Sequence, residues 1–265
     1  MINKHIPVML DEVKSFIPKN KKISVIDATF GGGGYSSSIL EEFNVSELLA
    51  IDRDPISQIF AKKFKKKFLN FKLINDKFSN IDKIIKKSKK YDLIIFDLGI
   101  SSNQIDIAER GFSFQNKGPL DMNMGLSNIN AYDIINLYDE KKIANIIYEL
   151  GNEKFSRRIA KNIVLNRKIK FINNTIELAE IIQKSIPKFK KTKIHPATKT
   201  FQALRIYIND EINELKFSLN KTLKILKKNG LLIIVSFQSL EDRIVKDFFN
   251  HNSGKRWRSS RHYPE

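Results

Sequence analysis

Cysteine is absent from the 265-residue sequence. Without it the chain forms no disulfide, no thiolate zinc site and no cysteine-ligated iron–sulfur cluster, and it has no cysteine nucleophile. Long apolar runs are absent as well: no stretch approaches the roughly 18 residues of a membrane-spanning helix, and Met1 to Pro7 lack the apolar run of a signal peptide. We therefore expect a cytoplasmic protein with no membrane span.

Acidic residues are few relative to basic ones. Lys and Arg total 47 against 29 Asp and Glu, which gives a formal net charge of +18. Such an excess favours a polyanionic partner, because neutralising phosphates releases condensed counterions. RNA, DNA and an anionic membrane surface all fit this charge, whereas lysine-rich stretches such as 62–67 and 86–90 are also typical of solvated helix faces. The net charge thus indicates a class of partner and leaves its identity open.

The order of apolar segments predicts a doubly wound α/β sheet. Runs of β-branched and aromatic residues alternate with segments whose apolar residues recur at helical spacing. The predicted strands cover residues 23–30, 48–51, 71–74 and 91–97, and the predicted helices cover 35–43, 59–68 and 81–87. Strands that alternate with helices in this way imply a parallel sheet covered on both faces.

After Ser102 the alternation stops, and no comparable strand follows until residues 231–237. Between them a long helix carries one apolar stripe and ends at Asn229-Gly230. The stripe consists of Ile212, Leu215, Leu219, Leu223 and Leu226. We predict a helical insertion over residues 110–205 within a domain formed by residues 1–109 and 206–265.

Two helix starts are predicted inside this insertion. Asp139 is placed to cap a helix that ends at Gly151. Asn174, with Glu177 three residues later, makes a helix start of the capping-box kind. The insertion is therefore expected to fold as helices.

Four glycines, Gly31 to Gly34, follow the first predicted strand and precede a predicted helix. Glycine lets the backbone approach a ligand closely, and a helix start offers free amide groups to an anion. A methionine carboxylate and a pyrophosphate both suit such a loop, but Ser36 stands where the dinucleotide fingerprint needs its third glycine. Asp52 ends the second strand, where a carboxylate accepts ribose hydroxyl hydrogens. The pattern predicts an adenosine-containing ligand of either kind.

The fourth predicted strand ends at Asp97, and Gly99, Ser101 and Ser102 follow it at the same edge. If the ligand carries a methyl group on a sulfonium, transfer is an in-line displacement for which the protein mainly positions the acceptor. The missing cysteine excludes the usual thiolate route to cytosine C5, which leaves nitrogen or oxygen acceptors. Asp97 or the Gly99 carbonyl is suited to hold the hydrogens of an exocyclic amine. The alternative is that Asp97 caps a turn and that the serines start the next segment.

Aromatic and histidine side chains near these motifs leave further alternatives open. Tyr35, Phe112 and Phe114 are suited to stack on an extruded base, but such residues are also typical of a core. His5 and His195 lack the spacing of metal ligands, so we predict no metal site. Each histidine is expected in a loop, where it touches substrate or caps a turn.

Seven motifs stand in order between His5 and about Phe249. They are Asp27–Gly34, Asp52–Pro55, Asp97–Ser102, Glu109–Phe114, Gly118–Met122, His195–Arg205 and Ser236–Arg243. In residues and spacing they resemble the bacterial small-subunit ribosomal RNA cytosine-N4 methyltransferases.

The resemblance implies a Rossmann-like class I methyltransferase sheet with an inserted all-helical substrate-recognition domain. It implies methyl transfer from S-adenosylmethionine (SAM), leaving S-adenosylhomocysteine, to the exocyclic N4 of a cytidine in the decoding centre of 16S rRNA within the small ribosomal subunit. Phe78 is expected against the adenine and Asp97 toward the sulfonium. The expected cofactor contacts are Gly33, Gly34, Tyr35, Asp52, Phe78, Asp97 and Gln104, and the expected catalytic residues are Asp97, Ser101 and Ser102.

Three features depart from the family pattern. Tyr35 and Gln238 stand where the family usually has histidine, so a titratable ring is missing at both positions. The family usually continues beyond Arg261–Glu265 with a basic segment and final strands. We therefore expect an incomplete sheet or a shortened form with a weaker grip on RNA.

These departures keep open a protein of another class, a non-catalytic RNA-binding or ribosome-assembly protein that retains the cofactor pocket. A nicotinamide-dependent oxidoreductase is disfavoured by Ser36 and by the lack of a clear hydride-transfer acid. A DNA methyltransferase is chemically close, but the Asp/Ser-Pro-Pro-Tyr/Phe run typical of amino-directed DNA enzymes does not follow the fourth strand. The motifs favour the rRNA enzyme.

Overall fold

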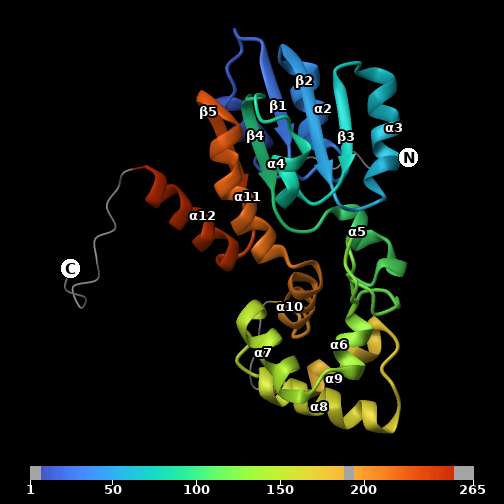
Figure 1. Ribbon diagram of the computed structural model, residues 1–265. Coiled ribbons are helices and arrows are strands. Elements are labelled where there is room, and N and C mark those ends of the chain that lie inside the picture. The colour runs from blue at the N-terminus through green and yellow to red at the C-terminus, as the bar shows by residue number, and fades with distance from the viewer. Residues whose placement is uncertain (1–6, 188–193, 254–265) are drawn as a thin grey trace, which may run out of the picture. The chain divides into compact units, whose positions relative to one another are not determined.

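A computed structural model describes residues 7–187 and 194–253 of the chain (Figure 1). The chain divides into two compact units. The sheet unit contains Ile6–Ile51, Lys63–Gly99 and Ile212–Glu265, and the helical unit contains Met1–His5, Asp52–Lys62 and Ile100–Glu211. His5 and Arg261–Glu265, on which two expectations fall, lie outside the described residues. The domain boundaries predicted at 109/110 and 205/206 stay a prediction.

The sheet unit is built on five strands in the order β3-β2-β1-β4-β5 (Figure 1). β1 pairs in parallel with β2 and β4, and β4 pairs in parallel with β5. Parallel neighbours need a crossover connection, usually a helix, which explains the alternation seen in the sequence. The strands are β1 (Ile23–Asp27), β2 (Val45–Asp52), β3 (Phe71–Asn75), β4 (Tyr91–Asp97) and β5 (Leu226–Val235). The predicted doubly wound sheet is confirmed.

Successive residues of a strand point to opposite faces of the sheet, and both faces carry apolar residues against which helices pack. On one face, residues of α4, α11 and α12 cluster with Ile26, Ile94 and Phe96 of the strands. Val25 and Leu93, which point to the other face, are buried as well. The helices of this unit are α1 (Leu10–Phe16), α2 (Gly34–Glu42), the 3₁₀ turn η1 (Phe78–Asn80), α4 (Ile81–Ile84), α11 (Glu211–Ile225) and α12 (Ser239–Asn252). α3 (Ser57–Lys67) begins in the helical unit and ends in the sheet unit.

The helical unit has its own aliphatic core. Within it α7 packs against α8 and α10, and α8 also packs against α9 (Figure 1). The core includes the fully buried residues Ile134, Ile143, Ile147, Ile159, Ile163, Leu178 and Leu204. The elements are α5 (Ser102–Asp106), the 3₁₀ turn η2 (Ala108–Arg110), α6 (Ala131–Leu137), α7 (Glu140–Gly151), α8 (Ser156–Ile169), α9 (Thr175–Ser185) and α10 (Thr198–Asn209). In the described part of 110–205 the backbone forms helices, turns and one isolated bridge, but no strand.

Both predicted helix starts are confirmed. The Asp139 side chain accepts a hydrogen bond from the Lys142 amide at 2.8 Å at the start of α7. The Asn174 side chain accepts one from the Glu177 amide at 3.0 Å at the start of α9. These acceptors satisfy amide groups that have no partner within the helix.

The predicted end of α7 at Gly151 is confirmed. Gly151 is the last helical residue, and Asn152 adopts the left-handed conformation with φ 48°. Gly151 is needed for another reason, because a Cβ there would lie 2.5 Å from the Lys199 carbonyl oxygen. Close packing against α10 therefore explains this glycine.

The predicted end of the long helix at Asn229-Gly230 is wrong. α11 ends at Ile225, and Leu226 already pairs with Tyr91 in the sheet. The register between β4 and β5 then shifts, so residues 227–230 form an irregularity within β5, where Asn229 has φ 62°. Pairing with β4 thus overrides the helical spacing of the apolar residues.

Other element ends differ from the prediction by a few residues. β1 ends at Asp27 instead of Phe30, α4 ends at Ile84 instead of Lys87, and β5 ends at Val235. Among the described residues, no helix combines the length and the apolarity needed to cross a membrane.

Replacing Asn174 with alanine removes the acceptor that caps α9. We expect the free energy of unfolding to fall by about 1 kcal/mol, the usual effect of losing an N-cap side chain, as measured by urea denaturation. Asn174→Ser is the matched control, because serine keeps a capping oxygen and should retain most of the stability. Equal losses in the two variants would contradict the capping role.

Candidate active site

The carboxyl ends of three neighbouring strands each carry an aspartate. β1 ends at Asp27, β2 at Asp52 and β4 at Asp97. Since these strands are parallel and adjacent, their carboxyl ends lie at one edge of the sheet. In doubly wound folds this edge is where ligands bind.

A glycine in the left-handed conformation starts the helix that follows β1. Gly33 has φ 82° and occupies the N-cap position of α2, where no side chain caps the helix. A Cβ at Gly33 would lie 2.5 Å from the Phe64 ring and 2.9 Å from the Phe30 ring. Both the backbone conformation and the lack of space therefore require glycine. The uncapped first turn leaves amide groups that suit an anionic group of a ligand.

Asp27 is a buried acid with its own donors. Its carboxylate accepts hydrogen bonds from the Ser36 hydroxyl at 2.6 Å and from the Thr29 amide at 3.2 Å. Burial raises the pKa of Asp27, although these two donors act in the opposite direction. Ser36, which breaks the dinucleotide fingerprint, is thus a buried donor to Asp27.

The backbone amide of Asp97 is hydrogen-bonded, but one of its side-chain oxygens has no partner among the described residues. Its amide donates to the Thr29 hydroxyl at 2.6 Å. Among the described residues, its buried Oδ1 atom has no hydrogen-bond partner. Burial, and then the nearby charge of Asp27, raise the pKa of Asp97 to about 7. This carboxyl group is suited to meet a cation or a hydrogen-bond donor that arrives from outside.

Tyr35 lies in the first turn of α2 and is buried. Its hydroxyl donates to the Val8 carbonyl oxygen. Burial raises the pKa of Tyr35, and the charges of Asp97 and Asp27 raise it further. Tyr35 is therefore a neutral phenol whose hydrogen is already used, and its burial argues for the core alternative over base stacking.

Phe78 packs at the edge of the sheet core. Its ring meets the Phe96 ring edge-on, with centroids 5.5 Å apart and an interplanar angle of 90°. The residue is half-buried. A fixed, half-buried aromatic residue suits contact with a planar group.

A buried network in the helical unit centres on Asp54. The Asp54 carboxylate accepts hydrogen bonds from both terminal nitrogens of Arg110, at 3.1 and 2.8 Å, and from the Gln104 amide nitrogen at 2.7 Å. The Gln104 Oε1 atom in turn accepts the Ser101 amide at 3.0 Å. The Asp54 amide donates to Asp52 Oδ1 at 2.8 Å. Asp52 and Gln104, two predicted cofactor contacts, are thereby joined through one residue.

The remaining predicted residues mostly serve local structure. Ser101 is the N-cap residue of α5, and Ser102 is the first residue of that helix, as the alternative interpretation expected. The His195 ring nitrogen accepts the Ala197 amide at 3.2 Å, which is the turn-capping alternative. Phe112 is buried in the helical core, and Phe114 packs against it.

Sequence reasoning missed Asp54, Arg110 and the role of Ser36. Asp54 and Arg110 lie within predicted motifs, but their pairing across 56 positions leaves no local signal. In the described residues, no group of three or more His, Asp or Glu side chains is placed to hold a metal.

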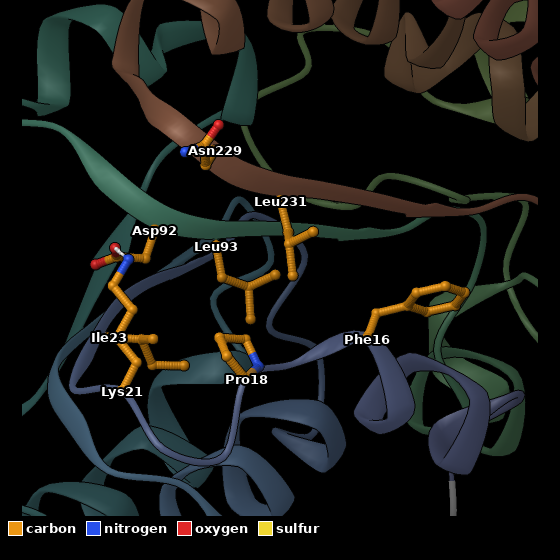
Figure 2. Close-up of a pocket in the computed structure, with 8 residues that line it drawn as sticks. All are labelled: Phe16, Pro18, Lys21, Ile23, Asp92, Leu93, Asn229 and Leu231. Carbon is orange, nitrogen blue, oxygen red and sulfur yellow. Dashed lines mark hydrogen bonds and ion pairs between the residues drawn. The ribbon is translucent and has the colours of Figure 1, made fainter.

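A pocket of about 200 Å³ lies at the opposite, amino edge of the sheet (Figure 2). Its acid, Asp92, pairs with Lys21 and Lys227 at 2.7 Å each and accepts the Ser24 hydroxyl at 2.9 Å. Burial acts to raise the pKa of Asp92, but these donors outweigh it and hold the pKa well below its usual range. Since its charge is already satisfied, we do not assign the active site to this pocket.

The comparisons with known proteins agree with the motifs. The model of the MraW methylase family matches residues 2–259. The chain belongs to this family. It is 49% identical over 263 residues to the ribosomal RNA small subunit methyltransferase H of Rickettsia massiliae and 51% identical over 257 residues to that of Rickettsia canadensis. Each alignment covers 96% of this chain and 82% of the relative.

Family membership confirms the resemblance and the Rossmann-like methyltransferase fold. The chain is also similar to the solved structure of NSun6 from Pyrococcus horikoshii with SFG, at 12% identity and a TM-score of 0.41. That likeness covers 92% of this chain and 40% of the other. A TM-score this low carries no argument about the site.

Replacing Asp97 with asparagine should stabilise the ligand-free protein at neutral and alkaline pH. The folded pKa of Asp97 is about 7 and its ordinary value is 3.8, so between these values the unfolded state ionises first and wild-type stability falls as pH rises. The difference between variant and wild type should therefore grow from pH 4 to pH 7, by up to about 1.4 kcal/mol for each pH unit, and then level off. Thermal melts across this range measure it.

Asp82→Asn is the control, because Lys221 lowers the pKa of Asp82 and the sign reverses. This variant should lose stability relative to wild type as pH rises through the range in which Asp82 ionises. If Asp97→Asn gives a difference that does not vary with pH, Asp97 is not the titrating group.

Proposed function

We propose that this protein transfers a methyl group from SAM to the exocyclic N4 of a cytidine in the decoding centre of 16S rRNA. Membership of a methylase family and relatives named ribosomal RNA small subunit methyltransferase H support a SAM-dependent enzyme of small-subunit rRNA. The observation that carries the N4 proposal is that the Oδ1 atom of Asp97, at the carboxyl end of β4, has no hydrogen-bond partner among the described residues. An exocyclic amine offers the hydrogens that such an oxygen accepts.

The residues at the sheet edge fit SAM. Bound SAM supplies a methyl group on a positively charged sulfonium. The uncapped start of α2 at Gly33 and Gly34 suits its carboxylate, and the Asp97 carboxyl, whose Oδ1 atom has no partner among the described residues, suits its cationic end. The proposed contacts are Gly33, Gly34, Tyr35, Asp52, Phe78, Asp97 and Gln104, with Asp52 accepting ribose hydroxyls and Phe78 against the adenine. Tyr35 would contribute its backbone, since its hydroxyl is used by Val8.

The acceptor side of the reaction falls to Asp97, Ser101 and Ser102. Asp97 or the Gly99 carbonyl would hold the amine hydrogens and so point the nitrogen lone pair at the methyl group. The nitrogen loses a proton on methylation, and a carboxyl whose pKa is about 7 is well matched to accept it near neutral pH. S-adenosylhomocysteine is the second product.

Substrate recognition is assigned to residues 110–205. This segment forms helices with a core of their own, and the partner we propose is 16S rRNA within the small ribosomal subunit. A chain that acts on ribosomal subunits would work in the cytoplasm.

A second function, RNA binding without turnover, is favoured by one observation. Tyr35 stands where the family usually has histidine and is a neutral, engaged phenol. If that histidine moves a proton in its relatives, this chain keeps the fold and binds RNA without methylating it.

Nucleoside mass spectrometry separates the two functions. Small subunits that lack methylated cytidines are incubated with the protein and SAM, and we expect N4-methylcytidine to appear. Asp97→Ala should lower the rate by 100-fold or more while the affinity for rRNA stays unchanged, because it removes the group that orients the amine. Cofactor binding without any methylated nucleoside would support the RNA-binding protein instead.

A further inference from the structure

One face of α8 is basic and exposed. Arg157, Arg158, Lys161 and Lys168 are all exposed to solvent. At 100° per residue these four positions fall within an arc of about 100° and span about 16 Å along the helix. The opposite side of α8, with Ile159 and Ile163, is buried in the core of the helical unit. The α8 basic face is thus a defined surface on a fixed helix.

The four cations form no ion pair among the residues that the structure describes. α8 contains no Asp or Glu. Arg167 of the same helix differs, because it is half-buried and donates to the Ile135 carbonyl oxygen at 2.7 Å. The structure therefore uses Arg167 and leaves the α8 basic face to solvent.

Neighbouring helices of the same unit do not share this pattern. The exposed side of α7 mixes Glu140 and Glu149 with Lys141 and Lys142. The exposed side of α9 carries Glu180 beside Lys184. The single sign of charge on α8 therefore distinguishes it from α7 and α9, the helices packed against it.

Apolar side chains lie among and beside these cations. Leu165 is 49% exposed, Ile169 is 88% exposed, and Phe171, just after the helix, is 53% exposed. Cations interleaved with exposed aliphatic and aromatic groups suit a nucleic acid strand, whose phosphates meet the cations and whose sugars and bases meet the apolar groups.

We infer that the α8 basic face binds the phosphate backbone of the rRNA substrate, with Phe171 placed for a base. This inference rests on the proposed function, because it names where the rRNA is gripped. We therefore expect substitutions on the α8 basic face to change the affinity for RNA without changing the rate of methyl transfer.

The test removes three of the cations together, as Arg157→Ala/Arg158→Ala/Lys161→Ala. Each phosphate contact contributes roughly 0.7 to 0.9 to the slope of log affinity against log salt. We expect the slope for a 16S rRNA transcript to fall by about 2 to 3 and the KM for small subunits to rise at least 10-fold. The kcat, the SAM affinity and the melting temperature should stay within twofold or a few degrees of wild type.

Lys62→Ala/Lys63→Ala/Lys66→Ala is the matched control, because it removes the same charge from exposed positions of α3. An equal loss of RNA affinity in this control would overturn the inference in favour of undirected attraction. So would an unchanged slope in the α8 variant, or binding of wild type to phosphatidylglycerol vesicles that is lost with the same three residues. If wild type binds RNA through α8 without methylating it, the proposed function fails and this inference stands.

A separate observation concerns the Asp54 network. Asp54 is 3% exposed and joins Asp52 to Gln104, while the Arg110 guanidinium neutralises it. Arg110 also donates to the Asn123 carbonyl oxygen at 2.8 Å, which fixes the guanidinium itself. The geometry points to Asp54 and Arg110 as positioning residues that set the two cofactor contacts, Asp52 and Gln104, without touching the cofactor.

Arg110→Lys tests this role mildly, since lysine keeps the charge but loses the paired hydrogen bonds. We expect the Kd for SAM, measured by calorimetry, to rise at least 10-fold, with the KM for small subunits unchanged. Arg205→Lys is the control, because Arg205 makes an equivalent two-bond pair with Glu211, at 2.8 Å for each bond, in the same unit. The control should lower the melting temperature by about as much as Arg110→Lys does and should keep the wild-type Kd for SAM.

Two results would overturn the positioning role. In one, both arginine variants weaken SAM binding equally, which makes the effect a general loss of fold. In the other, Arg110→Lys lowers the melting temperature but leaves the Kd for SAM at the wild-type value, which makes the network merely structural. Failure of wild type to methylate rRNA while it binds SAM affects only the proposed function.

Discussion

Two carboxyl groups lie at the ends of adjacent parallel strands, the buried Asp27 and the half-buried Asp97, whose Oδ1 atom is buried, and burial raises the pKa of both. Two such groups in a medium of low dielectric constant oppose each other's ionisation. The fold supplies Asp27 with donors from Ser36 and Thr29 but leaves the Oδ1 atom of Asp97 without a partner among the described residues. A cation or amine that binds at Asp97 therefore adds a favourable interaction that the ligand-free protein lacks. The glycine loop, α2 and the strand register all serve to hold this arrangement.

Asp54 and Asp92 differ from Asp97 in their partners. Asp54 and Asp92 are each paired with basic side chains at 2.7 to 2.8 Å, so their charges are satisfied within the fold. Removing one partner of such a pair leaves an uncompensated buried charge. The Oδ1 atom of Asp97 has no hydrogen-bond partner among the described residues, and the pKa of this group is raised to about 7. The contrast in partners, more than burial alone, singles out Asp97 for chemistry.

The sequence predicts the sheet well because its signals are local. The strand at 91–97 is correct to the residue, since a continuous apolar run suits a strand covered on both faces. Asp139 and Asn174 are correct as caps, because a cap depends on residues three positions apart. Leu226 is misassigned because pairing with Tyr91, distant in the chain, overrides helical spacing. The candidate site follows the same division: its strand-end aspartates are readable, whereas the Asp54–Arg110 pair is not.

The net charge is another property that does not locate the binding surface. The formal charge of +18 indicates an anionic partner but says nothing of where it binds. On α7 and α9 exposed lysines alternate with glutamates, and elsewhere Lys67 and Lys89 each pair with a glutamate, so many of the basic residues are balanced locally. What remains unbalanced on α8 is fixed in space by the buried Ile159 and Ile163 on the other side of the helix. Helical periodicity thus gathers basic residues on one side of α8. The side of α8 that packs into the core determines which side presents them to solvent.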